Sequence, residues 1–192
     1  MKYITYSESD KIKNDDKIVV LPIRSGLVCC CADGSTGTGE GDMASAFLIE
    51  SFMEKFSQEM NIHTFREIIL NAENKIQEKT NHAETTGILC FLKNDGQFYG
   101  VSVGDSLVYN INNNKTVRIN INTKPRIGNG ARIQEFYGKL THESYLMIAT
   151  DGISHQCPNI ETIKTLRPKD IITFLRGQEN LYDDFSLALL SL

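Results

Sequence analysis

The sequence lacks the features that would place a protein in a membrane, outside the cell or on a nucleic acid. Its apolar runs are far shorter than the roughly 20 residues that a bilayer-spanning helix needs. The N-terminal segment, 1–6, has no apolar stretch of the kind found in signal peptides. The formal net charge is -4, without the excess of lysine and arginine typical of nucleic-acid binding. We therefore expect a cytoplasmic protein with no membrane or nucleic-acid partner.

The five cysteines include no Cys-x-x-Cys pair, so a zinc or redox motif of that kind is excluded. Cys29, Cys30 and Cys31 are adjacent in a predicted strand, where successive side chains point to opposite faces. The three thiols therefore cannot bind one metal ion together. We expect them to be small buried residues in a reducing compartment.

The length of 192 residues predicts one domain, 1–192, with a core of its own. The predicted strands are short runs rich in β-branched and aromatic residues, at 17–21, 27–32, 86–92, 97–103, 107–111, 145–150 and 185–192. Helical spacing of apolar residues predicts helices at 42–60, 64–79 and 168–176. The weakly patterned stretch 122–139 is expected to be a loop with at most one strand.

Local signals refine the helix boundaries and the fold class. Asp42 is a predicted N-cap, and Thr64 with Glu67 has the pattern of a capping box at the start of the second helix. Asn94-Asp95-Gly96 predicts a tight hairpin between two central strands. Strands connected by hairpins, with helices set apart from them, favour an α+β fold over a parallel βαβ array.

Aspartates recur at the ends of the predicted strands. Asp15 and Asp16 precede the strand at 17–21, and Asp33 ends the next one. Asp151 ends the strand at 145–150, and Asp183 comes shortly before the last strand. A buried strand holds its end rigidly, and carboxylates from several strand ends can converge on one or two hard divalent cations. The recurrence therefore predicts a metal site.

The glycine-rich stretch 34–41 fits neither of two other phosphate or metal motifs. A P-loop needs Gly-Lys-Ser/Thr at its end, whereas Glu40 follows Gly39. An EF-hand loop that starts at Asp33 needs glycine at its sixth position and glutamate at its twelfth, where Thr38 and Ala44 stand. We expect these glycines to let the chain turn tightly from the strand into the helix.

The order of the acidic motifs resembles that of the PPM-type metal-dependent serine/threonine protein phosphatases. The resemblance covers about residues 11 to 190 and rests on Asn14-Asp15-Asp16, Ala32-Asp33-Gly34, Glu84-Thr85-Thr86, Val103-Gly104-Asp105-Ser106, Ala149-Thr150-Asp151-Gly152 and Asp183-Asp184-Phe185-Ser186. The short chain is similar to the small bacterial branch that regulates sporulation and stress sigma factors. The resemblance implies a β-sandwich of two antiparallel sheets flanked by helices, in the order α-β-β-α.

The resemblance also implies roles for individual residues. Asp33 matches the carboxylate that bridges two metal ions, and Gly34 matches the residue that offers its backbone carbonyl. Asp151 and Asp183 match the ligands that complete one metal, so the implied catalytic residues are Asp33, Asp151 and Asp183.

The second metal and the substrate are matched by residues near the N-terminus. Asp15 matches an acidic ligand on the side of the second metal, and Asp16 matches a residue that holds metal-bound water. Lys11 stands where the family commonly has an arginine that grips the substrate phosphate. Lysine supplies charge there but not a bidentate fork.

The implied activity is hydrolysis of serine/threonine phosphoproteins by a metal-activated water at a two-metal site. Two cations about 3.5–4 Å apart generate a nucleophile and neutralise the phosphoryl oxygens. The candidate ligands are all oxygen, which favours two Mn²⁺ or Mg²⁺ ions over zinc. The implied partners are a phosphoprotein substrate and a kinase or sigma-factor regulatory circuit, and we expect a monomer.

Some positions depart from the family pattern. Ser35 replaces a histidine found in eukaryotic members, and His155 replaces an aspartate that contributes to a third metal. We interpret Asp105 as a turn residue and Asp184 as a hydrogen-bonding neighbour of Asp183. The short spacing between Asp105 and Asp151 predicts a reduced flap. The alternative function is a non-catalytic phosphatase-like binding module.

Overall fold

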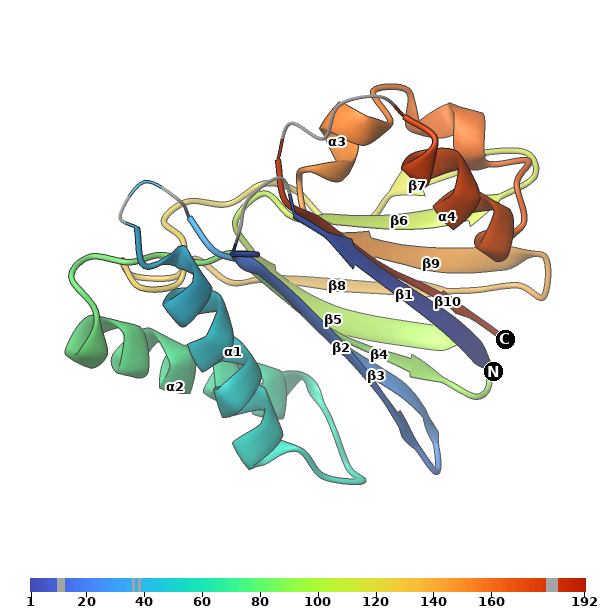
Figure 1. Cartoon of the computed structure of the whole chain (residues 1–192). Coiled ribbons are helices and arrows are strands. Elements are labelled where there is room, and N and C mark those ends of the chain that lie inside the picture. The colour runs from blue at the N-terminus through green and yellow to red at the C-terminus, as the bar shows by residue number, and fades with distance from the viewer. Residues whose placement is uncertain (10–12, 36, 38, 179–182) are drawn as a thin grey trace.

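The structure is a computed structural model that describes residues 1–9, 13–35, 37, 39–178 and 183–192. Two antiparallel five-stranded sheets form its centre (Figure 1). One sheet has the order β1 (Lys2–Glu8), β10 (Phe185–Ser191), β9 (Ser144–Ala149), β6 (Leu107–Asn112) and β7 (Thr116–Arg118). The other has the order β2 (Asp16–Ile23), β3 (Gly26–Asp33), β4 (Gly87–Lys93), β5 (Gln97–Val103) and β8 (Gln134–Lys139).

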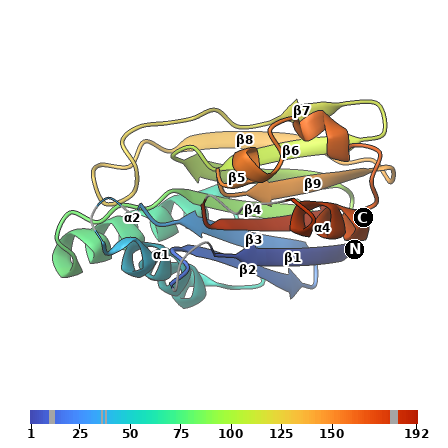
Figure 2. The same ribbon diagram turned by 45° about the horizontal axis from the view of Figure 1, so that its top comes forward.

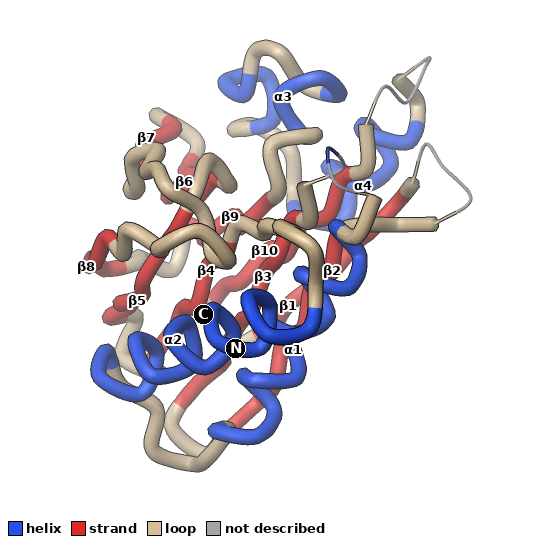
Figure 3. The backbone as a smooth tube through the Cα atoms, turned by 90° about the vertical axis from the view of Figure 1, so that its left-hand side faces the viewer, coloured by secondary structure: helices blue, strands red, loops and turns tan. Residues whose placement is uncertain are grey.

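Helices cover the outer face of each sheet. α1 (Gly41–Lys55) and α2 (Ile62–Lys79) lie side by side on the sheet that contains β3 (Figure 3). α3 (Ile153–Gln156), the 3-10 helix η2 (Ile160–Ile163) and α4 (Pro168–Arg176) lie on the other sheet. The result is the α-β-β-α arrangement that the resemblance implied, and the α+β prediction is confirmed.

Three apolar clusters hold these layers together, one between the sheets and one under each group of helical segments. The three adjacent cysteines of β3 contribute to two of these clusters. Cys30 packs toward α1 and α2, whereas Cys29 and Cys31 pack between the sheets, and all three are buried. The expectation that these cysteines are core residues on alternate faces is confirmed.

The two ends of the chain lie next to each other (Figure 2) because β1 pairs antiparallel with β10. β1 was not predicted from the sequence, since it is an edge strand with mostly exposed side chains and carries no strong apolar pattern. The stretch 122–139 contains β8 as its one strand, as expected. No helix in the described part of the chain is long and apolar enough to span a membrane.

The helix boundaries correct two predictions. α1 begins at Gly41 rather than Asp42 and ends at Lys55 rather than Met60. α2 begins at Ile62, because the side chain of Asn61 caps it by accepting the backbone N–H of Thr64 at 3.0 Å. Asparagine is as good an N-cap as threonine, so the true cap lies three residues before the predicted one.

Candidate metal site

A cavity of about 170 Å³ at one end of the sandwich gathers most of the acidic strand ends. Its described lining consists of Asp15, Asp16, Asp33, Gly34, Ser35, Arg126, Asp151, Asp183 and Asp184. Every residue predicted to bind metal is in this set, although these residues are far apart in the sequence. Lys11, the predicted phosphate-binding residue, lies outside the described residues.

The sheet topology explains the convergence. β2 and β3 are antiparallel neighbours whose register places Asp16 opposite Asp33. β9 and β10 are also antiparallel neighbours, so Asp151 after the end of β9 meets Asp183 before the start of β10. The strand ends at the same end of the two sheets therefore bring these pairs of carboxylates into one cavity.

Hydrogen bonds hold two of the acids in place. The Thr150 hydroxyl donates to the Asp16 carboxylate at 2.6 Å and accepts the backbone N–H of Ser186 at 2.8 Å. Asp16 on one sheet is thereby tied to the end of β9 on the other. Asp16 is 4% exposed, so the bond is shielded from water.

Asp184 forms hydrogen bonds to the segment that carries Asp15. Its carboxylate accepts the Ser9 hydroxyl at 2.6 Å and the backbone N–H of Asp15 at 2.7 Å. It is 4% exposed and follows Asp183 directly. These bonds agree with the expectation that Asp184 is a hydrogen-bonding neighbour of the site, and they fix the backbone of Asp15.

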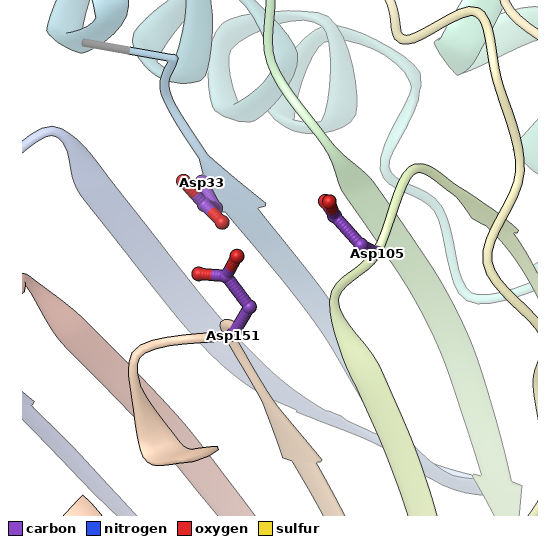
Figure 4. A group of neighbouring side chains, drawn as sticks. All are labelled: Asp33, Asp105 and Asp151. Atoms are coloured by element: carbon purple, nitrogen blue, oxygen red, sulfur yellow. The ribbon is translucent and has the colours of Figure 1, made fainter. Parts of the chain in front are cut away.

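Among the described residues, Asp33, Asp105 and Asp151 form a group that could share one metal ion. One carboxylate oxygen from each lies within 4.8 Å of the other two, and the three side chains come from different strand ends (Figure 4). Oxygen donors in this arrangement suit a hard divalent cation such as Mg²⁺ or Mn²⁺. Asp105, which we interpreted as a turn residue, therefore lies at the site as well.

The crowding of carboxyl groups raises several pKa values. Burial, followed by the nearby Asp184, Asp151 and Asp183, raises the pKa of Asp16 to about 7, although the Thr150 hydrogen bond opposes this shift. Burial, followed by the charges of Asp16 and Asp151, raises the pKa of Asp33 well above its usual range. A bound divalent cation would compensate this unfavourable charge, so the acids fit a metal site.

The pKa of Asp151 is raised by the same kind of surroundings. Burial is the largest cause, followed by the charges of Asp105 and Asp183. The positive charge of Arg126 lowers the pKa of both Asp151 and Asp33 and so opposes these shifts. Arg126 is the one cationic side chain in the described lining of the cavity.

These shifts predict how the metal-free protein responds to pH. A carboxyl whose pKa is raised on folding binds more protons in the folded state between about pH 4 and pH 7, so stability falls as pH rises through that window. We expect the Tm of EDTA-treated protein to fall between pH 5 and pH 8, and Mn²⁺ to oppose the fall most strongly at the higher pH. Thermal unfolding followed by circular dichroism measures both effects.

The Asp16→Asn variant is the control for the pH dependence. Removal of one raised carboxyl should make the Tm of the metal-free protein less dependent on pH. A Tm that rises from pH 5 to pH 8 without metal would show that the acids are not crowded as described.

The two positions that we interpreted as departures from the family pattern lie in different surroundings. Ser35 lines the cavity. His155 is exposed on α3 and is not part of the described lining. The segment between β6 and β8 contains the short β7 and a loop, 119–133, and the reduced flap stays a prediction.

Arg126 was missed from the sequence. It lies in the weakly patterned stretch 122–139, 21 positions after Asp105, together with Lys124, Arg132 and Lys139. No charge pattern or spacing links the two residues. Only the return of loop 119–133 to the end of the sandwich brings them together.

Comparison with solved structures identifies the fold. The serine/threonine phosphatase Stp1 from Staphylococcus aureus matches with a TM-score of 0.84 at 16% identity, over 100% of this chain and 94% of that one. RsbX in complex with magnesium matches with a TM-score of 0.79 at 17% identity, over 97% and 92%. The Mycobacterium tuberculosis serine/threonine phosphatase PstP/Ppp matches with a TM-score of 0.77 at 14% identity, over 100% of this chain and 98% of that one.

These neighbours are bacterial PPM-type serine/threonine phosphatases, so the resemblance stated from the motifs is confirmed at the level of the fold. No protein-family model matches the sequence. No curated protein matches it either. The agreement therefore lies in the three-dimensional arrangement, while most side chains differ from those of the solved structures.

Proposed function

We propose that this chain, which shares the fold of bacterial PPM-type phosphatases, is a metal-dependent serine/threonine phosphoprotein phosphatase. The observation that carries the proposal is the convergence of Asp15, Asp16, Asp33, Asp151 and Asp183 in one cavity at the end of the sandwich. When bound there, two Mn²⁺ or Mg²⁺ ions would lower the pKa of a water molecule and neutralise the phosphoryl oxygens.

In the proposed roles, most of the acids bind metal directly and one orients a water molecule. Asp33, Asp151 and Asp183 are the central carboxylates, and the backbone carbonyl of Gly34 adds a ligand beside Asp33. Asp15 belongs to the second metal, and Asp16 orients water through the carboxylate that Thr150 holds. Lys11 remains a predicted phosphate-binding residue.

The proposed substrate is a phosphoprotein in the cytoplasm, and the chain would act as a monomeric single domain. A kinase or sigma-factor regulatory circuit is the proposed setting, as the resemblance of the acidic motifs implies. The other class of function is a phosphatase-like module that binds a phosphoprotein without turnover. The retained acids favour the enzyme, because a binding module has no need of five converging carboxylates.

Release of phosphate from p-nitrophenyl phosphate and from a phosphothreonine peptide tests the proposal. We expect turnover of both substrates with Mn²⁺ and none with EDTA. Absence of turnover on both substrates, in protein shown to bind Mn²⁺, would favour the binding module instead.

A further inference from the structure

We propose that Arg126 is a phosphoryl-binding residue, held by Asp105 so that its free N–H groups face the substrate. The inference rests on the proposed function and names a residue that the motif series does not include. Arg126 lines the acidic cavity, whereas its ion-pair partner Asp105 is not among the residues that line it. The guanidinium thus presents positive charge to the space that a phosphate group would enter.

The ion pair leaves most of the guanidinium available. A single terminal nitrogen, Nη2, donates to both Asp105 oxygens, at 3.0 and 2.8 Å. Arginine carries five N–H donors, and those on Nη1 and Nε have no hydrogen-bond partner among the described residues. An ion pair that served structure alone would gain more from the two-nitrogen fork that arginine and carboxylate commonly form.

The loop that carries Arg126 is fixed without its side chain. The neighbouring Ile127 exchanges two backbone hydrogen bonds of 3.0 Å with Thr85, and its side chain is fully buried. Thr85 in turn pairs with Gly34 and donates its hydroxyl to the backbone carbonyl of Asp33 at 2.9 Å. The backbone of Arg126 is therefore tied to the segment that carries the proposed bridging carboxylate.

Glu73 on α2 clamps the other side of the same loop. Its carboxylate accepts the backbone N–H groups of Gly128 at 2.7 Å, Gly130 at 2.6 Å and Ala131 at 3.3 Å. Gly128 and Gly130 have φ values of +108° and +88°, which a residue with a side chain adopts at a cost. With the loop anchored at Ile127 and at Glu73, the Arg126 side chain is not needed as an anchor.

The chemistry of arginine matches a phosphoryl group. Its planar fork binds two phosphate oxygens at once, and it keeps its charge at any physiological pH. The side chain is 22% exposed, so it is partly shielded from water yet open to the cavity. The other charged side chains in the described lining are carboxylates, which repel an anion. The fixed positive charge of Arg126 would therefore help to orient the phosphate beside the metal ions.

Binding of inorganic phosphate to the Mg²⁺-loaded protein, measured by calorimetry, tests this role. We expect Arg126→Met to weaken phosphate binding about 10- to 100-fold, as for loss of hydrogen bonds to a charged group. Arg126→Lys keeps the positive charge but not the two-nitrogen fork, so it should lose less phosphate affinity than Arg126→Met. The KM for p-nitrophenyl phosphate should rise in the same order.

Arg132→Met is the matched control, because Arg132 lies exposed in the same loop and does not line the cavity. It should leave phosphate affinity within about twofold of the wild type, as is usual for a surface substitution. The proposal is overturned if Arg126→Met also stays within that range, even if its Tm falls, because Arg126 would then serve only the loop. An equal loss in Arg132→Met overturns it too.

The same set of proteins separates this inference from the proposed function. If the wild type hydrolyses p-nitrophenyl phosphate and Arg126→Met binds phosphate normally, only the inference fails. If the wild type shows no turnover, the proposed function fails, and the phosphate titration still decides the role of Arg126. A wild type that does not bind phosphate at all also overturns the role of Arg126.

Discussion

Asp33→Asn and Asp151→Asn should each lower Mn²⁺-dependent turnover by more than about 100-fold. Loss of a residue that only hydrogen-bonds a metal ligand already lowers activity by up to about 100-fold, and these two residues are proposed ligands themselves. Both residues come from strand ends, and a carboxylate oxygen of one lies within 4.8 Å of a carboxylate oxygen of the other. Asparagine keeps the shape of the side chain but removes the charge that the cations need. Steady-state hydrolysis of p-nitrophenyl phosphate measures the loss.

The fold should survive both substitutions. Burial and neighbouring acids raise the pKa of Asp33 and Asp151, so removal of either carboxylate relieves repulsion in the metal-free protein. We expect the Tm without metal to equal or exceed that of the wild type at pH 8. Asp95→Asn, in the β4–β5 hairpin, is the control and should retain turnover. Unchanged turnover in both site variants would show that the site has been misplaced.

Gly34→Ala should lower the free energy of unfolding by about 3 kcal/mol or more, at the upper end of the cost of overpacking. A Cβ atom at this position would lie 2.0 Å from the backbone oxygen of Gly41 and 2.9 Å from that of Asp15. Backbone cannot move aside as a flexible side chain can. The chain must therefore shift next to Asp33, and Mn²⁺ binding should weaken together with stability. Urea denaturation and metal titration measure the two effects.

Gly37→Ala is the matched control for this substitution. Gly37 follows in the same glycine-rich stretch and is exposed, and the nearest atom of the described residues to the added Cβ is the Ser35 hydroxyl at 4.0 Å. It should change the free energy of unfolding by less than about 0.5 kcal/mol. Equal stability of the two variants would mean that the close approach of Gly34 and Gly41 is not a constraint.

The convergence of acids in this cavity could be predicted because each of the predicted acids marks a strand end. A buried strand has an apolar pattern that the sequence displays, and an acid directly after it has no packing role. Asp33 and Asp151 follow fully buried residues, Ala32 and Thr150, so the contrast is sharp in the sequence. Their convergence then follows from strand pairing, which the order of motifs implied.

Asp105 and Arg126 could not be assigned in the same way. Gly104 before Asp105 has a φ of +93°, so the segment is a genuine turn and looks like any other turn in the sequence. Arg126 depends on the path of a loop that Glu73 and Thr85 hold through backbone groups. Backbone hydrogen bonds between distant segments leave no residue pattern. β1 could not be predicted from the sequence for the same reason, because it pairs with β10 through backbone groups and has few buried side chains.

The most direct test of the metal site is calorimetric titration of EDTA-stripped protein with Mn²⁺, beside Asp33→Asn. We predict two ions bound per chain, with proton release as the raised carboxyl groups ionise. Asp33→Asn should lose most of this binding, because Asp33 is proposed to bridge both ions. Absence of binding at millimolar Mn²⁺ would contradict the account, because every proposed catalytic role acts through the cations.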